Sequence, residues 1–293
     1  MQPNYAEILR RHGFSFSKAK GQNFIVNPAV CPRMAAQCGA TKADGVLEIG
    51  PGAGALTRAL SDVAGKVVAV ELDDRLLPVL EETLAGLDNI TVIQGDILQL
   101  DLPALLEEHF QGRPAHVCAN LPYYITSPII MRLLESRLPF AGITVMAQKE
   151  AADRLCAPMG TRACGAVTAA VAYYAEARQL FNVSRGSFFP VPNVDSAVLR
   201  LAPRPAPPVD VPDENFFFRL IRAAFNQRRK TAANAISAGL PLDKSAVLAA
   251  MARANIPAES RAENLTLEAW AALAVELCRD ARQCVSNISN ISS

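Results

Sequence analysis

The clearest pattern in the sequence is a series of short apolar runs separated by amphipathic segments. Five such runs lie between residues 46 and 148: VLEIG, VVAVEL, ITVIQGD, AHVCANL and GITVMAQ. Runs that are apolar on both faces and alternate with helical patterns are typical of a parallel sheet covered by helices. Two later runs, in residues 180–190 and 195–203, predict a closing pair of antiparallel strands. We therefore expect an α/β fold.

Both ends of the chain add elements to this sheet. Residues 5–12 predict a short helix, a basic loop with the sequence FSFSKAKGQNF follows, and Asn27-Pro28 can start another helix. The stretch APRPAPPVDVP, residues 202–212, contains five prolines and excludes regular structure. Beyond it, helical periodicity covers residues 214–236, 243–256 and 266–281. We predict two domains, residues 1–204 and residues 205–293, the second all-helical.

Charge is segregated along the chain, although the net charge is only +1. Residues 71–108 hold ten acids and one base. Residues 216–234 hold five bases and no acid: Arg219, Arg222, Arg228, Arg229 and Lys230. The simpler alternative is a solvated helix surface. A one-sided basic segment of this kind also predicts contact with a phosphate backbone.

Cysteine usage and hydropathy indicate where the protein works. None of the seven cysteines forms a Cys-x-x-Cys pair, so we expect reduced thiols and no metal site. No stretch approaches the length of a membrane span, and the first residues lack an apolar signal region. A cytoplasmic protein without a membrane partner is the expectation.

A glycine-rich turn follows the first predicted strand at residues 48–54, EIGPGAG. Glycines between a strand and a helix allow the backbone to approach a bound nucleoside closely, because no Cβ intervenes. The spacing is G-x-G-x-G, and Pro51 removes an amide donor that a pyrophosphate cradle would use. The turn favours a nucleoside without a pyrophosphate, with a tight turn that binds nothing as the alternative.

Two acids lie at the ends of the next two predicted strands. Glu71 ends VVAVE, about 20 residues past the glycine turn, where an acid can accept hydrogen bonds from ribose hydroxyls. Asp96 follows ITVIQG, where it can accept a hydrogen bond from an adenine amine. The alternative for Asp96 is a cap on the segment that follows.

The element that decides the chemistry is Asn120-Leu121-Pro122-Tyr123, directly after the run AHVCA. The exocyclic amine of adenine is a poor nucleophile, because its lone pair is delocalised into the ring. The Asn120 side-chain oxygen and the Leu121 carbonyl can accept the two amine hydrogens and turn the lone pair toward an incoming methyl group. Tyr123 offers a flat face for an extruded base, and Pro122 stiffens the turn. A proline turn that merely starts a helix is the alternative.

With these residues identified, the chain resembles the ribosomal RNA adenine dimethyltransferase family, in particular its bacterial small-subunit (16S) branch. The resemblance covers about residues 14–277 and rests on six motifs: GQNF, EIGPG, NLPYYITSPI, QKEAADRL, FFPVPNVDSAV and AFNQRRKT. It implies a Rossmann-like methyltransferase domain with a mostly parallel seven-stranded sheet and a helical C-terminal domain. It also implies S-adenosylmethionine as donor, with N6,N6-dimethyladenosine as product at two adjacent adenosines in a 3′-terminal hairpin of 16S rRNA.

The resemblance also assigns roles to individual residues. The implied donor contacts are Asn23, Ile25, Gly50, Glu71, Asp96 and Asn120. Tyr123 and Phe188 are the implied aromatics that sandwich the target base, with Phe189 as an adjacent alternative. The implied rRNA contacts are the bases of a helix containing AFNQRRKT, namely Arg228, Arg229 and Lys230, and the charge pattern adds Arg222 to this predicted RNA-binding set. The implied partner is the assembling small ribosomal subunit, bound by a monomer during ribosome biogenesis.

The sequence departs from the family pattern at a few positions and leaves several alternative functions open. The chain differs from the usual pattern at Lys20, Ile25, Asn27, Cys164 and Ala166. A 23S rRNA adenine dimethyltransferase of the macrolide-resistance type is the nearest alternative, and the intact AFNQRRKT and FFPVPNVDSAV motifs favour the small-subunit branch. A non-catalytic nucleic-acid-binding relative and a protein or small-molecule N-methyltransferase are the further alternatives.

Overall fold

The computed structural model describes residues 3–14 and 23–291, with side chains described up to residue 279. The chain divides into two compact units. The sheet unit comprises Met1–Asp153 and Ala175–Pro203, and the helical unit comprises Arg154–Tyr174 and Arg204–Ser293. The division after Pro203 coincides with the proline-rich stretch. Residues 154–174, which the predicted boundary left with the first domain, group with the helical unit.

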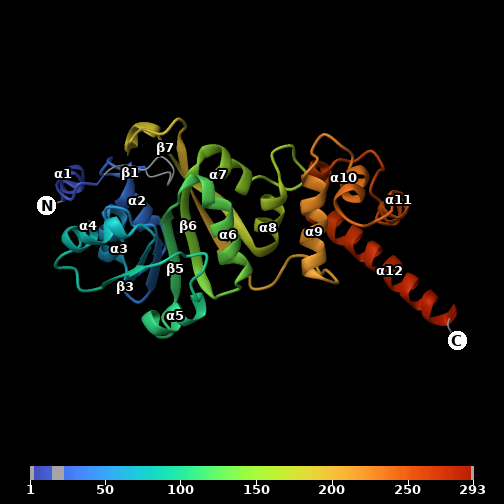
Figure 1. Ribbon diagram of the computed structural model, residues 1–293, viewed down its shortest axis with the longest axis horizontal. Helices are drawn as coiled ribbons and strands as arrows, with labels where there is room; N and C mark the ends of the chain where they lie inside the picture. Colours follow the sequence, from blue (N-terminus) through green and yellow to red (C-terminus); the bar gives the residue numbers. More distant parts are fainter. Residues whose placement is uncertain (1–2, 15–22, 292–293) are drawn as a thin grey trace. The chain divides into compact units, whose positions relative to one another are not determined.

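The sheet unit is built on a seven-stranded sheet in the order β4-β3-β2-β5-β6-β9-β7 (Figure 1). Its strands are β2 (Gly45–Ile49), β3 (Lys66–Glu71), β4 (Ile90–Gln94), β5 (Ala115–Asn120), β6 (Phe140–Gln148), β7 (Ala175–Val183) and β9 (Ser196–Pro203). The first five run parallel, and β9 is antiparallel to both β6 and β7. The predicted α/β class, the mostly parallel sheet and the antiparallel closing strands are confirmed.

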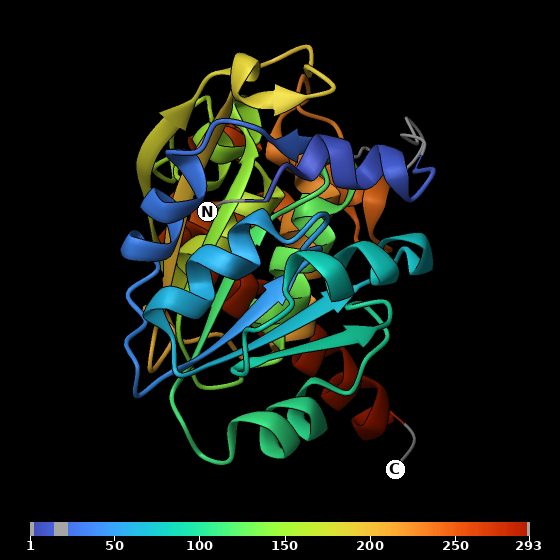
Figure 2. The same cartoon turned by 90° about the vertical axis from the view of Figure 1, so that its left-hand side faces the viewer.

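Helices cover the sheet on both faces (Figures 1 and 2). They are α2 (Val30–Gln37), α3 (Ala55–Val63), α4 (Leu77–Thr83), α5 (Leu102–Phe110), α6 (Thr126–Glu135) and α7 (Lys149–Leu155). The strands beneath them are buried on both sides, so almost every side chain of β2 and β3 enters a core. One core cluster joins Met34 of α2 and Leu60 of α3 to Val46, Val67 and Val198 of the sheet. This burial explains the continuous apolar runs of the sequence.

Two small elements lie beside the main sheet. Helix α1 (Tyr5–Arg11) is capped by Asn4, whose side chain accepts a hydrogen bond from the Glu7 amide. Strands β1 (Phe24–Ile25) and β8 (Phe188–Phe189) form a separate two-stranded antiparallel sheet. The predicted strand at residues 180–190 is therefore interrupted: β7 ends at Val183, and a short 3-10 turn precedes β8.

The helical unit contains five helices in the part of the chain that is described. They are α8 (Ala166–Tyr174), α9 (Glu214–Phe225), α10 (Ala232–Gly239), α11 (Lys244–Arg253) and α12 (Leu267–Ile291). Trp270 and Phe217 are fully buried in this unit, and the Tyr173 hydroxyl donates to Glu214. A helix through AFNQRRKT was predicted, and this is wrong: α9 ends at Phe225, and Thr231 starts α10 by accepting from the Asn234 amide. The polar run between them carries no apolar residue to pack, so it forms a turn.

Two features are absent from the residues that the structure describes. No helix among them is long and apolar enough to cross a membrane. Within the same residues, no group of three or more His, Cys, Asp or Glu side chains could hold a metal ion.

Candidate active site

A cavity of about 590 Å³ opens at the carboxyl ends of the central strands of the sheet unit. Its lining comes from the segments that follow β2, β3, β4 and β5, from α1, and from the β1–β8 sheet. Open α/β sheets bind ligands at this edge, where the strand order reverses, and the reversal here lies between β2 and β5. The volume is that of a site for a drug-sized or nucleoside-sized ligand.

The predicted glycine turn forms one wall of the cavity. Gly50 and Gly52 have φ values of +69° and +61°, and Gly54 is the N-cap of α3 with φ +88°. Residues that carry a Cβ rarely adopt these positive φ values, whereas glycine adopts them readily. A Cβ on Gly54 would also lie 2.9 Å from the Thr83 hydroxyl. The turn therefore presents the bare backbone of residues 50–52 to the cavity.

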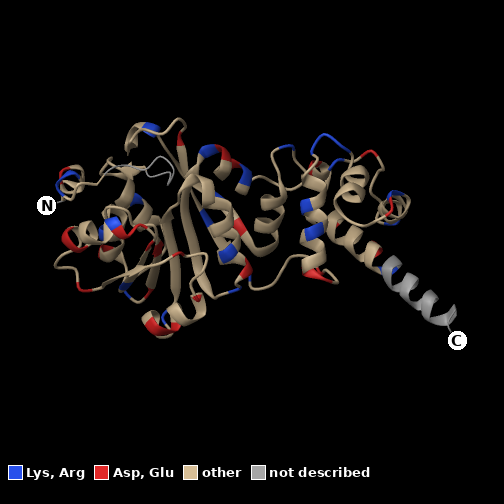
Figure 3. Cartoon of the chain, viewed as in Figure 1, with Lys and Arg blue, Asp and Glu red and all other residues tan. Residues whose placement is uncertain are grey.

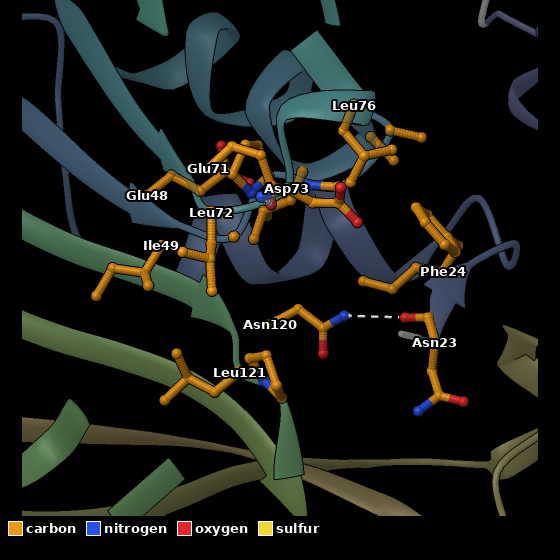
Figure 4. Close-up of a pocket in the computed structure, with 18 of the residues that line it drawn as sticks. Asn23, Phe24, Glu48, Ile49, Glu71, Leu72, Asp73, Leu76, Asn120 and Leu121 are labelled. Carbon is orange, nitrogen blue, oxygen red and sulfur yellow. Dashed lines mark hydrogen bonds between the residues drawn. The ribbon is translucent and has the colours of Figure 1, made fainter. Parts of the chain in front are cut away.

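Glu71 ends β3 beside this turn and is almost fully buried (Figure 4). Its Oε2 accepts a hydrogen bond from the Gly52 amide at 3.1 Å, and its Oε1 accepts from the Asp73 amide at 2.8 Å. Burial raises the pKa of Glu71, while these amide hydrogen bonds oppose the rise. These bonds hold the carboxylate at the end of β3, where the sequence predicted an acceptor for ribose hydroxyls.

Asp96 lies at the cavity after β4 and also caps the turn that follows it. Its Oδ1 accepts from the Leu98 amide at 3.0 Å, and its Oδ2 accepts from the Gln99 side-chain nitrogen at 3.1 Å. The structural alternative for Asp96 is therefore present together with the predicted position, and the two are compatible because each carboxylate oxygen accepts more than one hydrogen bond.

Asn120 is the last residue of β5, and its side chain reaches across the cavity toward Asn23. Its Nδ2 donates to the Asn23 carbonyl at 3.3 Å, which turns Oδ1 away from Asn23 (Figure 4). The Leu121 amide donates to the Met146 carbonyl at 3.1 Å and holds the start of the NLPY turn on the sheet. The backbone and side-chain acceptors that the sequence singled out thus lie on one rigid segment.

Tyr123 opens a 3-10 turn, Tyr123–Ile125, that Pro122 precedes. The Tyr123 hydroxyl and the Ser196 hydroxyl are 2.9 Å apart in a hydrogen bond, and burial raises the pKa of Tyr123. The Pro122 carbonyl accepts from the Thr126 hydroxyl at 3.1 Å, which ties the turn to α6. These bonds hold the half-buried ring in place at the cavity.

Nine predicted residues line this cavity together: Asn23, Ile25, Gly50, Glu71, Asp96, Asn120, Leu121, Pro122 and Tyr123. Phe188 does not. It is 1% exposed and packs in the sheet-unit core, whereas the neighbouring Phe189 is 50% exposed and lines the cavity. In the β1–β8 sheet Phe189 lies opposite Phe24, and both of these side chains line the cavity. Gly21, Gln22 and Lys20 lie outside the described residues.

The cavity also contains residues that the sequence reasoning did not select. Glu48 is 1% exposed and lines it, and no described residue hydrogen bonds to Glu48 Oε2. Burial raises the pKa of Glu48 to about 8, and the Glu71 carboxylate adds to the rise. An acid inside an otherwise apolar run, VLEIG, was the available signal. Tyr5 and Tyr124 also line the cavity; Tyr124 belongs to the NLPYYITSPI motif, but neither tyrosine was assigned a role from the sequence.

The predicted RNA-contacting bases belong to the helical unit. Arg222 lies on α9, and Arg228, Arg229 and Lys230 lie in the turn after it, and all four are exposed. Figure 3 shows basic positions along α9 and in the segment that follows it. Arg228 is tied down within the unit: its guanidinium donates to the Arg162 carbonyl at 2.8 Å and to Glu263 at 3.2 Å. The Arg228 guanidinium also donates to the Cys164 carbonyl, at 3.5 Å. Cys164, one of the positions that depart from the family pattern, is buried.

Fold and cavity together define a Rossmann-like methyltransferase, in which a glycine turn and a strand-end acid lie beside an Asn-Leu-Pro-Tyr segment. Residues 13–278 match the ribosomal RNA adenine dimethylase family. The chain therefore belongs to this family, as the sequence motifs predicted.

Individual relatives agree with this membership. The chain is 47% identical over 275 residues to the ribosomal RNA small subunit methyltransferase A of Bacillus licheniformis, covering 92% of this chain and 94% of the relative. The protein of that name from Bacillus mycoides is 46% identical over 271 residues, 91% and 93% of the two chains. A dimethyladenosine transferase from Plasmodium falciparum has a similar structure, with TM-score 0.72, 26% identity and coverage of 88% and 98%. The structure of the 23S rRNA methyltransferase ErmE is also similar, with TM-score 0.66 and 28% identity, and the match covers 87% of this chain and 100% of ErmE.

Proposed function

We propose that this chain transfers methyl groups from S-adenosylmethionine to N6 of two adjacent adenosines in the 3′-terminal hairpin of 16S rRNA. The product is N6,N6-dimethyladenosine, formed on the assembling small subunit in the cytoplasm. The observation that carries the proposal is the placement of Asn120, Leu121 and Tyr123 in the same cavity as the glycine turn and Glu71. An acceptor pair for an amine thus lies beside a nucleoside site.

The residues present fit the donor. Gly50 and Gly52 bare the backbone, Glu71 presents a fixed carboxylate to ribose hydroxyls, and Asp96 presents one to an adenine amine. The buried Glu48 also faces this cavity, but its pKa of about 8 keeps it neutral at pH 7, so the negative charge comes from the other acids. A cavity with several acids suits a cationic ligand. When bound, the donor supplies an electrophilic methyl group on a sulfonium.

The chain's own residues prepare the adenosine. In the first transfer Asn120 Oδ1 and the Leu121 carbonyl accept the two N6 hydrogens, and in the second transfer one of them accepts the single hydrogen that remains, so that the nitrogen lone pair points at the methyl group. Tyr123 stacks on one face of the extruded base, and its bond to Ser196 keeps the ring from turning. We assign the opposite face to Phe189 in place of Phe188, because Phe188 lies in the core. The amine loses its extra proton after attack, so catalysis rests on alignment rather than on a tuned base.

The choice of the small-subunit RNA rests on the relatives and on the helical unit. The relatives at 46% and 47% identity are named as small subunit methyltransferases, whereas ErmE is 28% identical. Arg222, Arg229 and Lys230 supply exposed bases for phosphate contacts. We expect a monomer to bind the subunit.

A methylation assay with three substrates tests the proposal. The protein is incubated with labelled S-adenosylmethionine and either small subunits from a strain without this modification, large subunits, or free nucleosides. The labelled base is then identified after digestion. We expect N6,N6-dimethyladenosine from small subunits only. Label on large-subunit RNA would establish the 23S alternative, and no label on any RNA would leave only the non-catalytic or the protein-directed alternatives.

A further inference from the structure

Exposed apolar side chains of the sheet unit gather around the mouth of the cavity. The large hydrophobic residues that are exposed, within the described chain, are Val26, Leu72, Tyr124, Phe189, Val191 and Val194. Four of them line the cavity, and the other two follow Phe189 in the same loop. Scattered exposed apolar residues need no explanation, but a set collected at one opening marks a binding surface.

Tyr124 differs from its neighbour Tyr123 in exposure and in hydrogen bonding. Tyr123 is half-buried and bonded to Ser196, whereas Tyr124 is 57% exposed. Successive residues of a 3-10 turn point about 120° apart, since the turn has about three residues. The two tyrosines therefore face different directions, one into the cavity and one at its mouth. No described residue forms a hydrogen bond with the Tyr124 hydroxyl.

We propose that Tyr124 is a stacking surface for the unpaired nucleobase that adjoins the target adenosine in the same RNA. The inference rests on the proposed function. Extruding one adenosine into the cavity draws its neighbour, one phosphodiester link away, to the mouth and unstacks it. An exposed aromatic ring at that place offsets the loss, because base–aromatic stacking tolerates any base. The surface is continuous with the cavity wall formed by Tyr123, so both bases meet aromatic rings of one turn.

Because the two target adenosines are adjacent, each serves as the neighbour when the other occupies the cavity. Tyr124 then stacks on the neighbouring base in at least one of these two arrangements. Donor binding does not involve this side chain in the proposed arrangement. Loss of the ring should therefore raise the KM for the RNA substrate and leave the donor dissociation constant unchanged.

A cycle that changes both the protein and the RNA tests this contact. Tyr124→Ala and wild type are each assayed on small subunits reconstituted with unmethylated rRNA. A second pair of subunits carries an abasic site in place of one target adenosine or the other, and methylation is scored at the adenosine that remains. Tyr124→Phe, which keeps the ring and removes only the hydroxyl, is the matched control.

We expect Tyr124→Ala to raise the KM for intact subunits by about 5- to 100-fold, the scale of one stacked base, with Tyr124→Phe close to wild type. On at least one abasic subunit, the Ala variant and wild type should have equal KM values, because the partner of the ring is gone. Equal ratios of Ala to wild type on intact and abasic subunits would overturn the inference. That outcome leaves the proposed function intact, which fails only if wild type does not methylate small subunits.

Discussion

Replacing Glu48 by glutamine is expected to make the stability of the sheet unit less dependent on pH. Glu48 is buried in β2, no described residue pairs with its Oε2, and burial raises its pKa from 4.5 to about 8. Between these two pH values the folded chain holds a proton that the unfolded chain has released. The stabilising contribution of the neutral carboxyl is therefore complete below about pH 4.5 and is lost as the pH rises through 8.

The size of this effect follows from the width of that window. Each pH unit inside it lowers the free energy of unfolding by at most about 1.4 kcal/mol, so the loss at pH 9 is a few kcal/mol. Glutamine has nearly the same shape and no charge, so Glu48→Gln should lack this loss. Its amide has two N–H donors where the neutral carboxyl group has one O–H donor, and the site offers Oε2 no hydrogen-bond partner among the described residues, so the added donor costs about 1–3 kcal/mol at every pH. The variant should be less stable than wild type at pH 5 and as stable or more stable at pH 9.

Urea denaturation at half-unit steps from pH 5 to pH 9 measures this crossing. Glu107→Gln, at an exposed position of α5, is the matched control and should follow the wild-type curve. Two parallel curves for wild type and Glu48→Gln would show that Glu48 does not take up a proton on folding, and the reasoning about its burial would be wrong.

The remaining predictions concern the cavity and the basic turn. Asn120→Ala should lower kcat about a hundredfold or more, while donor affinity falls less than about tenfold in calorimetry. Glu71→Ala should weaken donor binding by about 10- to 150-fold, the value of hydrogen bonds to a charged group; unchanged affinity would contradict its role. Phe188→Ala should destabilise the protein by about 3–5 kcal/mol in urea, whereas Phe189→Ala should lower activity on subunits with little effect on stability. A plot of log binding constant against log salt concentration should have a slope that is less steep by about one for Arg229→Gln, the value of one lost phosphate contact.

Much of the sheet unit could be predicted from the sequence, because parallel strands buried on both faces leave continuous apolar runs. The five runs correspond to β2 through β6, and the strand-end residues Glu71 and Asn120 are where the runs placed them. The carboxyl ends of parallel strands meet at one edge, so residues distant in sequence were expected to share a site. The cavity at this edge fits that expectation.

Other features depend on contacts between distant segments and left no local signal. Strands β1 and β8 have two residues each, too few for a visible alternation, and their pairing joins Phe24 to Phe189. The sequence therefore held no local signal for which of two adjacent phenylalanines faces the cavity. The end of α9 at Phe225 was missed for a related reason: helical periodicity resumes after Thr231, and the polar residues between were assigned to one continuous helix.

The charges around the cavity explain why RNA affinity has to come from outside it. At neutral pH the charged side chains of the described lining are three acids, Glu71, Asp73 and Asp96, and one base, Arg10, because the raised pKa of the buried Glu48, about 8, keeps its carboxyl group protonated. Such a lining suits a cationic donor and an uncharged base, but it does not stabilise the phosphates on either side of the extruded nucleotide. The phosphates must therefore remain in solvent or meet bases elsewhere, such as the exposed residues after α9. We therefore expect two separable parts in RNA binding: a salt-dependent part from those bases, and a part from the aromatic rings at the cavity that salt does not alter.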